Sequence, residues 1–165
     1  MNGLLPLFVI TLIYVAILLV VLWLSDVEKM EALLKLLTAF ALGFAAVVIA
    51  AGIESTFALF VSASSVFMIV VVAPIVEEIA KIDMATRSFY KDMDEPEDSL
   101  IYGGVVALGF GFLENILYIL KYSMELSYLQ LADLTIARML YSIPAHIAAT
   151  VTGTATVSYT HLRAH

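Results

Sequence analysis

The stretch Pro74-Ile75-Val76-Glu77-Glu78-Ile79-Ala80-Lys81 sets two adjacent carboxylates and a lysine at the end of a long apolar run. No charged residue lies in residues 55–76, so a helix through this run is expected to be in lipid when it reaches Glu77. A charge at that depth costs roughly 2.5–3.5 kcal/mol unless it is paired or faces water. Lys81 offers a pairing, because it follows Glu77 by four positions and Glu78 by three. The alternative is a helix that ends at the membrane surface with its charges in solvent.

The composition of the chain places it in a membrane. Of its 165 residues, 62% are hydrophobic, and the mean hydropathy is +1.02, which is too apolar for a soluble domain. We expect an all-α, polytopic membrane bundle of about five transmembrane helices in one domain. The net charge of -7 excludes nucleic acid as a partner. The lack of cysteine excludes disulfides, thiolate metal sites and a cysteine nucleophile.

Apolar segments of spanning length follow one another along the chain. A helix needs roughly 20 residues to cross the hydrocarbon core of a bilayer. Spans of about this length are expected at residues 4–24, 33–53, 55 to the Glu-Glu pair, 100–120 and about 139–157. Between them, residues 82–99 are interpreted as the one long polar loop, and residues 121–138 as a connector with helical character.

Basic residues and the end of the chain complete the predicted layout. The basic residues near one membrane face are Lys29, Lys35, Lys81, Arg87 and Lys91, against Lys121 and Arg138 near the other. The positive-inside rule therefore predicts the acidic loop in the cytoplasm and the N-terminus outside. We also expect the protein to be in the plasma membrane. Residues 158–165 are interpreted as a non-native tail after a membrane domain of residues 1–157. His161 and His165 are therefore left out of any site.

Three of the expected spans carry ionisable or amide groups inside apolar sequence. These groups are Glu77 with Glu78, Glu114 with Asn115, and His146. A single such group can be explained by one structural hydrogen bond. Three helices that each bury polar groups in the membrane, against the free-energy cost of doing so, indicate a shared polar cavity. A glutamate there suits a general base, while histidine or asparagine suits a proton carrier, a metal ligand or an oxyanion donor.

Two neighbours of these groups are expected to support the cavity. Phe110 lies one helical turn before Glu114 on the same face, where its ring can wall the carboxylate. Pro144 lies two residues before His146, and its missing N–H frees a carbonyl for water or a ligand. The alternative for each of these residues is ordinary helix packing.

Three short motifs resemble those of a known family. Glu77-Glu78-Ile79-Ala80-Lys81 is similar to the EExxK signature of the PrsW family of intramembrane proteases, which is related to the CAAX prenyl endopeptidases. Phe110-Gly111-Phe112-Leu113-Glu114-Asn115 resembles that family's FxxxEN motif. Ser142-Ile143-Pro144-Ala145-His146 resembles its third motif. The three occur in order and cover roughly residues 72–149.

The resemblance implies a role for each matching residue. Glu77 would be the general base that activates water, with Glu78 as its partner, held by Lys81. The Glu114-Asn115 pair would bind the metal or water and the carbonyl oxygen, and His146 would complete the site. The family usually carries a further histidine in a later span, so the chain is expected to be truncated at its C-terminus.

The predicted function is that of an intramembrane endopeptidase that hydrolyses a peptide bond of a membrane-anchored protein, such as an anti-sigma factor in a signalling cascade. Its cofactor stays open, because Glu77, Glu114 and His146 suit zinc and equally suit a metal-free glutamate mechanism. One competitor is a non-catalytic scaffold of the same fold. Another is a proton- or ion-coupled transporter. Such a transporter is expected to contain internal repeats, and the sequence does not show them.

Overall fold

The computed structural model describes residues 3–25, 32–93 and 96–162, and all regular elements in these ranges are helical. The elements are α1 (Leu5–Leu24), α2 (Leu33–Phe57), the π-helical turn η1 (Met68–Val72), α3 (Ala73–Phe89), α4 (Pro96–Tyr122), α5 (Tyr128–Ala137), the π-helical turn η2 (Arg138–Ser142) and α6 (Ile143–Leu162). The predicted all-α bundle is confirmed. The expected tail from residue 158 continues α6 as far as Leu162.

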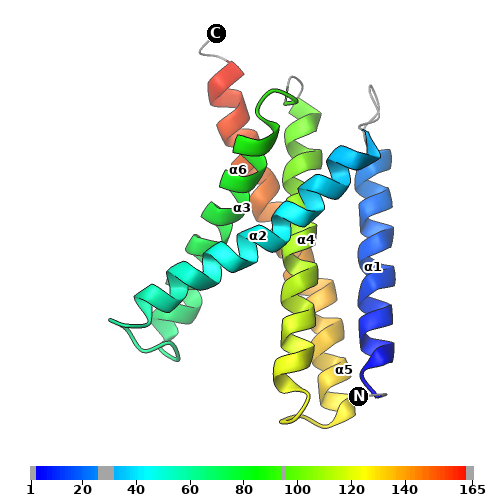
Figure 1. Cartoon of the computed structure of the whole chain (residues 1–165), viewed down its shortest axis with the longest axis vertical. Helices are drawn as coiled ribbons and strands as arrows, with labels where there is room; N and C mark the ends of the chain where they lie inside the picture. Colours follow the sequence, from blue (N-terminus) through cyan, green and yellow to red (C-terminus); the bar gives the residue numbers. More distant parts are fainter. Residues whose placement is uncertain (1–2, 26–31, 94–95, 163–165) are drawn as a thin grey trace.

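The central helix of the bundle is α4, and α2 crosses it in Figure 1. Residues 101–110 of α4 are all buried. Glycines make the crossing possible, because a Cβ on Gly43 of α2 would collide with the α4 backbone at Val106. In the same way, a Cβ on Gly109 of α4 would collide with the α2 backbone at Phe40. Small residues thus bring two helix backbones into contact beside the polar groups of α4.

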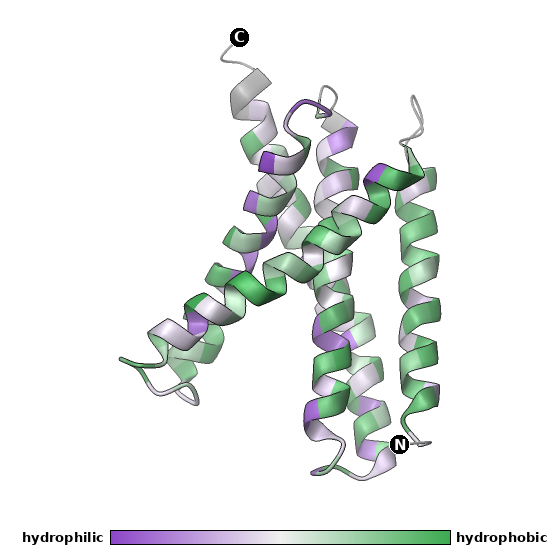
Figure 2. Ribbon diagram, in the orientation of Figure 1, coloured by the Kyte–Doolittle hydropathy of each residue, from purple (hydrophilic) through white to green (hydrophobic). Residues whose placement is uncertain are grey.

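Helices of membrane-spanning length account for most of the described chain. Four are long and apolar enough to cross a membrane, covering residues 5–24, 33–57, 97–122 and 128–159. Figure 2 shows α1 and most of α2 as hydrophobic, with hydrophilic residues gathered along α3. Apolar outer surfaces are what contact with lipid requires. The protein is therefore a polytopic integral membrane protein.

The expected span from Ser55 to the Glu-Glu pair has the wrong boundaries. α2 continues to Phe57, residues 58–65 turn back, and a new helical segment runs from residue 66 through η1 and α3. Glu77 and Glu78 therefore lie near the start of α3 rather than at the end of a helix. Length and composition do not select this segment as a fifth span, because α3 carries several charged residues after the pair.

The expected long polar loop at residues 82–99 is also wrong. α3 runs to Phe89 and α4 begins at Pro96. The last turns of α3 form because they bury apolar side chains, and the Phe89 ring stacks on Tyr102 of α4 with centroids 4.1 Å apart. Asp94 and Glu95, from the centre of the expected acidic loop, lie outside the described residues.

The connector expected at residues 121–138 joins the last span more closely than predicted. α5, η2 and α6 follow one another without a break, so the helix begins at Tyr128 rather than near Met139. A capping box starts it: Ser127 accepts from the Gln130 backbone N–H, and the Gln130 side chain accepts from the Ser127 N–H. This pairing satisfies backbone donors that the first turn of a helix leaves free.

Two prolines each follow a π-helical turn. η1 ends two residues before Pro74, and η2 ends two residues before Pro144. A proline inside a helix lacks an N–H and clashes with the carbonyl four residues back, so a wider turn relieves the conflict. The backbone N–H of Ile143 accordingly bonds to the Arg138 carbonyl, five residues back. A π-helical turn therefore lies just ahead of Pro144 and His146.

Candidate active site

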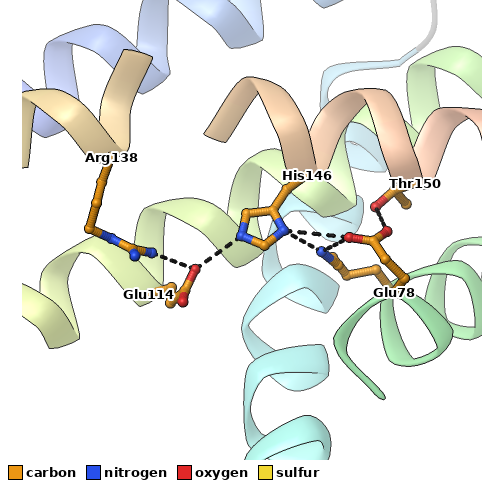
Figure 3. Close-up of polar contacts among 6 residues, drawn as sticks. Glu78, Glu114, Arg138, His146 and Thr150 are labelled. Carbon is orange, nitrogen blue, oxygen red and sulfur yellow. Dashed lines mark hydrogen bonds and ion pairs between the residues drawn. The ribbon is translucent and has the colours of Figure 1, made fainter. Parts of the chain in front are cut away.

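His146 lies between two glutamates from different helices, as Figure 3 shows. Its Nε2 is 3.1 Å from Oε2 of Glu114 on α4, and its Nδ1 is 3.5 Å from Oε1 of Glu78 on α3. The two carboxylates and the imidazole are partly buried. Three helices that are distant in sequence thus bring their ionisable side chains into one cluster.

Lys81 connects the cluster on the α3 side. Its side chain is completely buried; it forms an ion pair with Glu78, and its Nζ lies 2.6 Å from Nδ1 of His146. An ammonium group only donates, so Nδ1 accepts here and the imidazole proton is placed on Nε2, toward Glu114. The Lys81 ammonium also lies 4.4 Å from the centre of the Phe110 ring. Thr150 of α6 completes the group by donating to Glu78 Oε2 over 2.8 Å.

Arg138 contacts the cluster on the opposite side of His146 (Figure 3). Its Nη2 lies 2.6 Å from Oε2 of Glu114, and its Cζ lies 3.7 Å from the centre of the Tyr118 ring. From the sequence, Arg138 is expected only near a membrane face. A signal was available, because Arg138 is the only Lys or Arg in the candidate span of residues 128–159.

A cavity of about 490 Å³ lies between α2, α3 and α4 next to this cluster. Glu77 and Glu114 both line it, so these two predicted residues share one space. Glu54 of α2 lines it as well, although this residue falls between two of the expected spans. Much of the remaining wall comes from small or apolar residues, including Val47, Ala50, Ala51, Ala58, Ala63, Met68, Ala73 and Phe110. The arrangement can hold an apolar segment beside carboxylates.

Phe110 contributes to both the cavity and the cluster. Its ring centroid is 5.2 Å from that of His146, so it packs beside the imidazole as well as under the Lys81 ammonium. The side chain is 2% exposed. The predicted neighbour of Glu114 thus walls the imidazole, and it covers a charged group that would otherwise face the apolar core.

Asn115 is placed away from the cluster. Its Nδ2 donates to Oγ1 of Thr11 on α1 over 3.1 Å, and the Thr11 hydroxyl donates to the Leu7 carbonyl over 2.8 Å. Successive helix positions point about 100° apart, so Glu114 faces the cavity while its neighbour faces α1. The structure therefore does not bring Asn115 together with Glu77, Glu114 and His146.

The comparison with protein families identifies the class of protein. The model of the PrsW family of intramembrane metalloproteases matches residues 31–165, which is most of the chain. No curated protein and no solved structure matches it. The chain belongs to the PrsW family, and it is a protease enzyme of the membrane.

The family's description implies a metal, and the expected ligands were Glu77, Glu114 and His146. In the described part of the chain, no group of three His, Asp or Glu side chains is arranged to hold a metal ion. Lys81 contacts one imidazole nitrogen, and Arg138 contacts the Glu114 oxygen that faces the other. Two cations thus occupy positions beside the expected donors, and the arrangement does not fit a bound metal.

Proposed function

We propose that the protein hydrolyses a peptide bond of a membrane-anchored protein at the cavity beside Glu77 and Glu114. The observation that carries this proposal is the 3.1 Å contact between His146 Nε2 and Glu114 Oε2 at the edge of a cavity that Glu77 also lines. A general base must stand within reach of the water it activates, and the leaving amine must receive a proton. Glu77 and Glu114 both line this cavity, and His146, which does not line it, contacts Glu114.

In this mechanism Glu77 is the general base that takes a proton from water. Glu77 has no ion pair with a described cation, whereas Glu78 is bound to Lys81 and Thr150. A glutamate without a bound cation is the better proton acceptor of the two. Glu78 then acts through its partners, by holding the imidazole of His146 in place.

Glu114 is the second carboxylate at the cavity, and His146 holds it in place. The proton that Glu77 takes from water passes on from Glu77 to the departing amine, so Glu77 ends the cycle ionised as it began. Glu114, which accepts from the Nε2–H of His146, stays fixed at the cavity wall, where it can accept a hydrogen bond from that amine. Asn115 has no part in this step, because its amide is bound to Thr11. No step depends on zinc or another metal.

The substrate class follows from the walls of the cavity. Alanines and other small side chains leave room for a bulky apolar segment, and two of the helices around the cavity, α2 and α4, are candidate membrane spans. We propose a single-span membrane protein, cut in or next to its membrane segment, with a plasma-membrane signalling protein such as an anti-sigma factor as one candidate. Such a protein reaches the site by diffusion in the bilayer.

The test is cleavage of a library of single-span membrane reporters, each with randomised residues beside and within its membrane segment. The library is co-expressed with the wild-type protein or with Glu77→Gln. We expect the wild type to cleave some reporters and Glu77→Gln to cleave none, at equal amounts of membrane protein. Glu97→Gln is the matched control, because Glu97 is exposed on the first turn of α4.

The outcomes separate the protease from its competitors. Equal cleavage by wild type and Glu77→Gln, or no cleavage by either, would favour the non-catalytic scaffold. Treatment of the purified, active protein with a zinc chelator then tests the mechanism. Unchanged cleavage is expected for the glutamate mechanism, while loss that added zinc restores would show that a metal takes part.

A further inference from the structure

Arg138 is a buried cation that the proposed reaction does not use. Two arginines lie in the described part of the chain, and their surroundings differ. The Arg87 side chain is 79% exposed and pairs with Asp83 one turn away on α3. The Arg138 side chain is 13% exposed and pairs with Glu114 on another helix. A guanidinium inside a membrane bundle is costly, which makes its position a pointer to function.

The contacts of Arg138 fix both the arginine and its partner. The Arg138 Cζ lies 3.7 Å from the centre of the Tyr118 ring, and its Nη2 forms an ion pair with Oε2 of Glu114 over 2.6 Å. The cation–π contact and the ion pair together restrict the rotamers of Arg138. The same Oε2 atom lies 3.1 Å from Nε2 of His146.

One carboxylate oxygen, Oε2 of Glu114, is therefore in contact with both Arg138 and His146. With Arg138 and His146 both at Oε2, the Glu114 carboxylate cannot turn without breaking two contacts. No hydrogen bond from a described residue reaches the other oxygen, Oε1, and Glu114 lines the cavity. Oε2 of Glu114 is thus engaged by Arg138 and His146, while Oε1 is left for the reacting groups.

We propose that Arg138 is a positioning residue of the protease site, which acts by fixing Glu114 against His146. This inference rests on the proposed function, because it assigns Arg138 a part in that same reaction. Arg138 does not line the cavity, so it acts through Glu114 rather than on the substrate. Its place at the first residue of η2 also ties the π-helical turn before Pro144 to α4.

A purely structural ion pair is the competing explanation. It would fasten η2 to α4 and would lower the stability of the protein when removed, but the folded fraction would keep its turnover number. A positioning residue lowers kcat in folded protein and leaves KM nearly unchanged, because the substrate still fills the same cavity. Misplacing a reacting group by about 1 Å can cost on the order of 100-fold in rate.

The experiment measures kcat and KM for a reporter that the wild type cleaves, with purified protein and reporter in the same liposomes. The variants are Arg138→Met, which keeps the length without the charge, and Arg138→Lys, which keeps the charge without the planar fork. We expect Arg138→Met to lower kcat by about 100-fold and Arg138→Lys by about tenfold, with KM within about twofold. Arg87→Met is the control, with wild-type kinetics expected.

Folded protein is quantified by thermal unfolding in detergent, so that each kcat refers to folded molecules. A wild-type kcat for folded Arg138→Met overturns the inference. If Arg138→Met does not fold, Arg138→Lys decides, and a wild-type kcat in that variant overturns the inference as well. A wild-type protein that cleaves no reporter is a failure of the proposed function itself, and this inference then falls with it.

Discussion

Lys81 of α3 places its Nζ 2.6 Å from Nδ1 of His146 on α6, and its side chain has no exposed surface. The contact orients the imidazole, because an ammonium group can only donate and so selects which ring nitrogen carries the proton. It also joins α3 to α6 beside the cavity that Glu77 and Glu114 line. The positions of Glu78 and His146 depend on this one buried cation.

Replacing Lys81 by methionine should destabilise the protein. The change leaves the Glu78 carboxylate without its cation, and removing one partner of a buried ion pair costs about 3–5 kcal/mol. Because Glu78 is partly exposed, we expect a loss near the lower end of that range. Thermal unfolding in detergent measures it. The double variant Lys81→Met/Glu78→Gln should recover part of the loss, and a single variant as stable as the wild type would contradict this account.

Thr150→Val should reduce activity as well as stability. The threonine hydroxyl donates to Glu78 Oε2 over 2.8 Å, and a hydrogen bond to a charged group contributes about 1.5–3 kcal/mol. If the bond holds Glu78 in place for His146, kcat falls by roughly tenfold or more. Thr152→Val is the control, because the exposed Thr152 hydroxyl bonds only its own helix at Ala148. Equal kcat values for the two variants would remove Thr150 from the site.

Asn115→Ala should behave as a packing defect rather than as the loss of a catalytic group. Its amide ties α4 to Thr11 of α1, so we expect lower stability and a kcat within about threefold of wild type per folded molecule. Thr11→Val should lower the free energy of unfolding by a similar amount. The double variant should lower it by less than the sum of the two single effects. A kcat lowered by about 100-fold or more in folded Asn115→Ala would instead support the oxyanion-donor role.

Gly43→Ala should disturb the site from a distance. A Cβ at this position collides with the α4 backbone at Val106, so α2 must move away from α4. Overpacking of this kind costs about 1–3 kcal/mol, and the shift would widen the cavity that α2 and α4 share. Gly52→Ala on the same helix meets open space and serves as the control. Unfolding temperature and reporter cleavage are both expected to fall for Gly43→Ala alone.

The membrane helices that are apolar throughout could be predicted from the sequence. The expected spans at residues 4–24, 33–53 and 100–120 agree with α1, α2 and α4 within a few residues. The boundaries around α3 could not be predicted in the same way. Its charges suggested a polar loop, whereas in the fold they belong to a helix whose other face packs on α4 through Phe89.

The sequence by itself determined the class of protein, because the apolar spans and three spaced polar motifs define a PrsW-family membrane protease. Tertiary structure decided which polar side chains meet. Glu114 and Asn115 are adjacent in the chain, but the helix turns them toward different neighbours, His146 and Thr11. Arg138 reaches the site only because α5, η2 and α6 form one continuous helix along α4. Spacing fixes the direction of a side chain on its own helix, while its partner depends on how the helices pack.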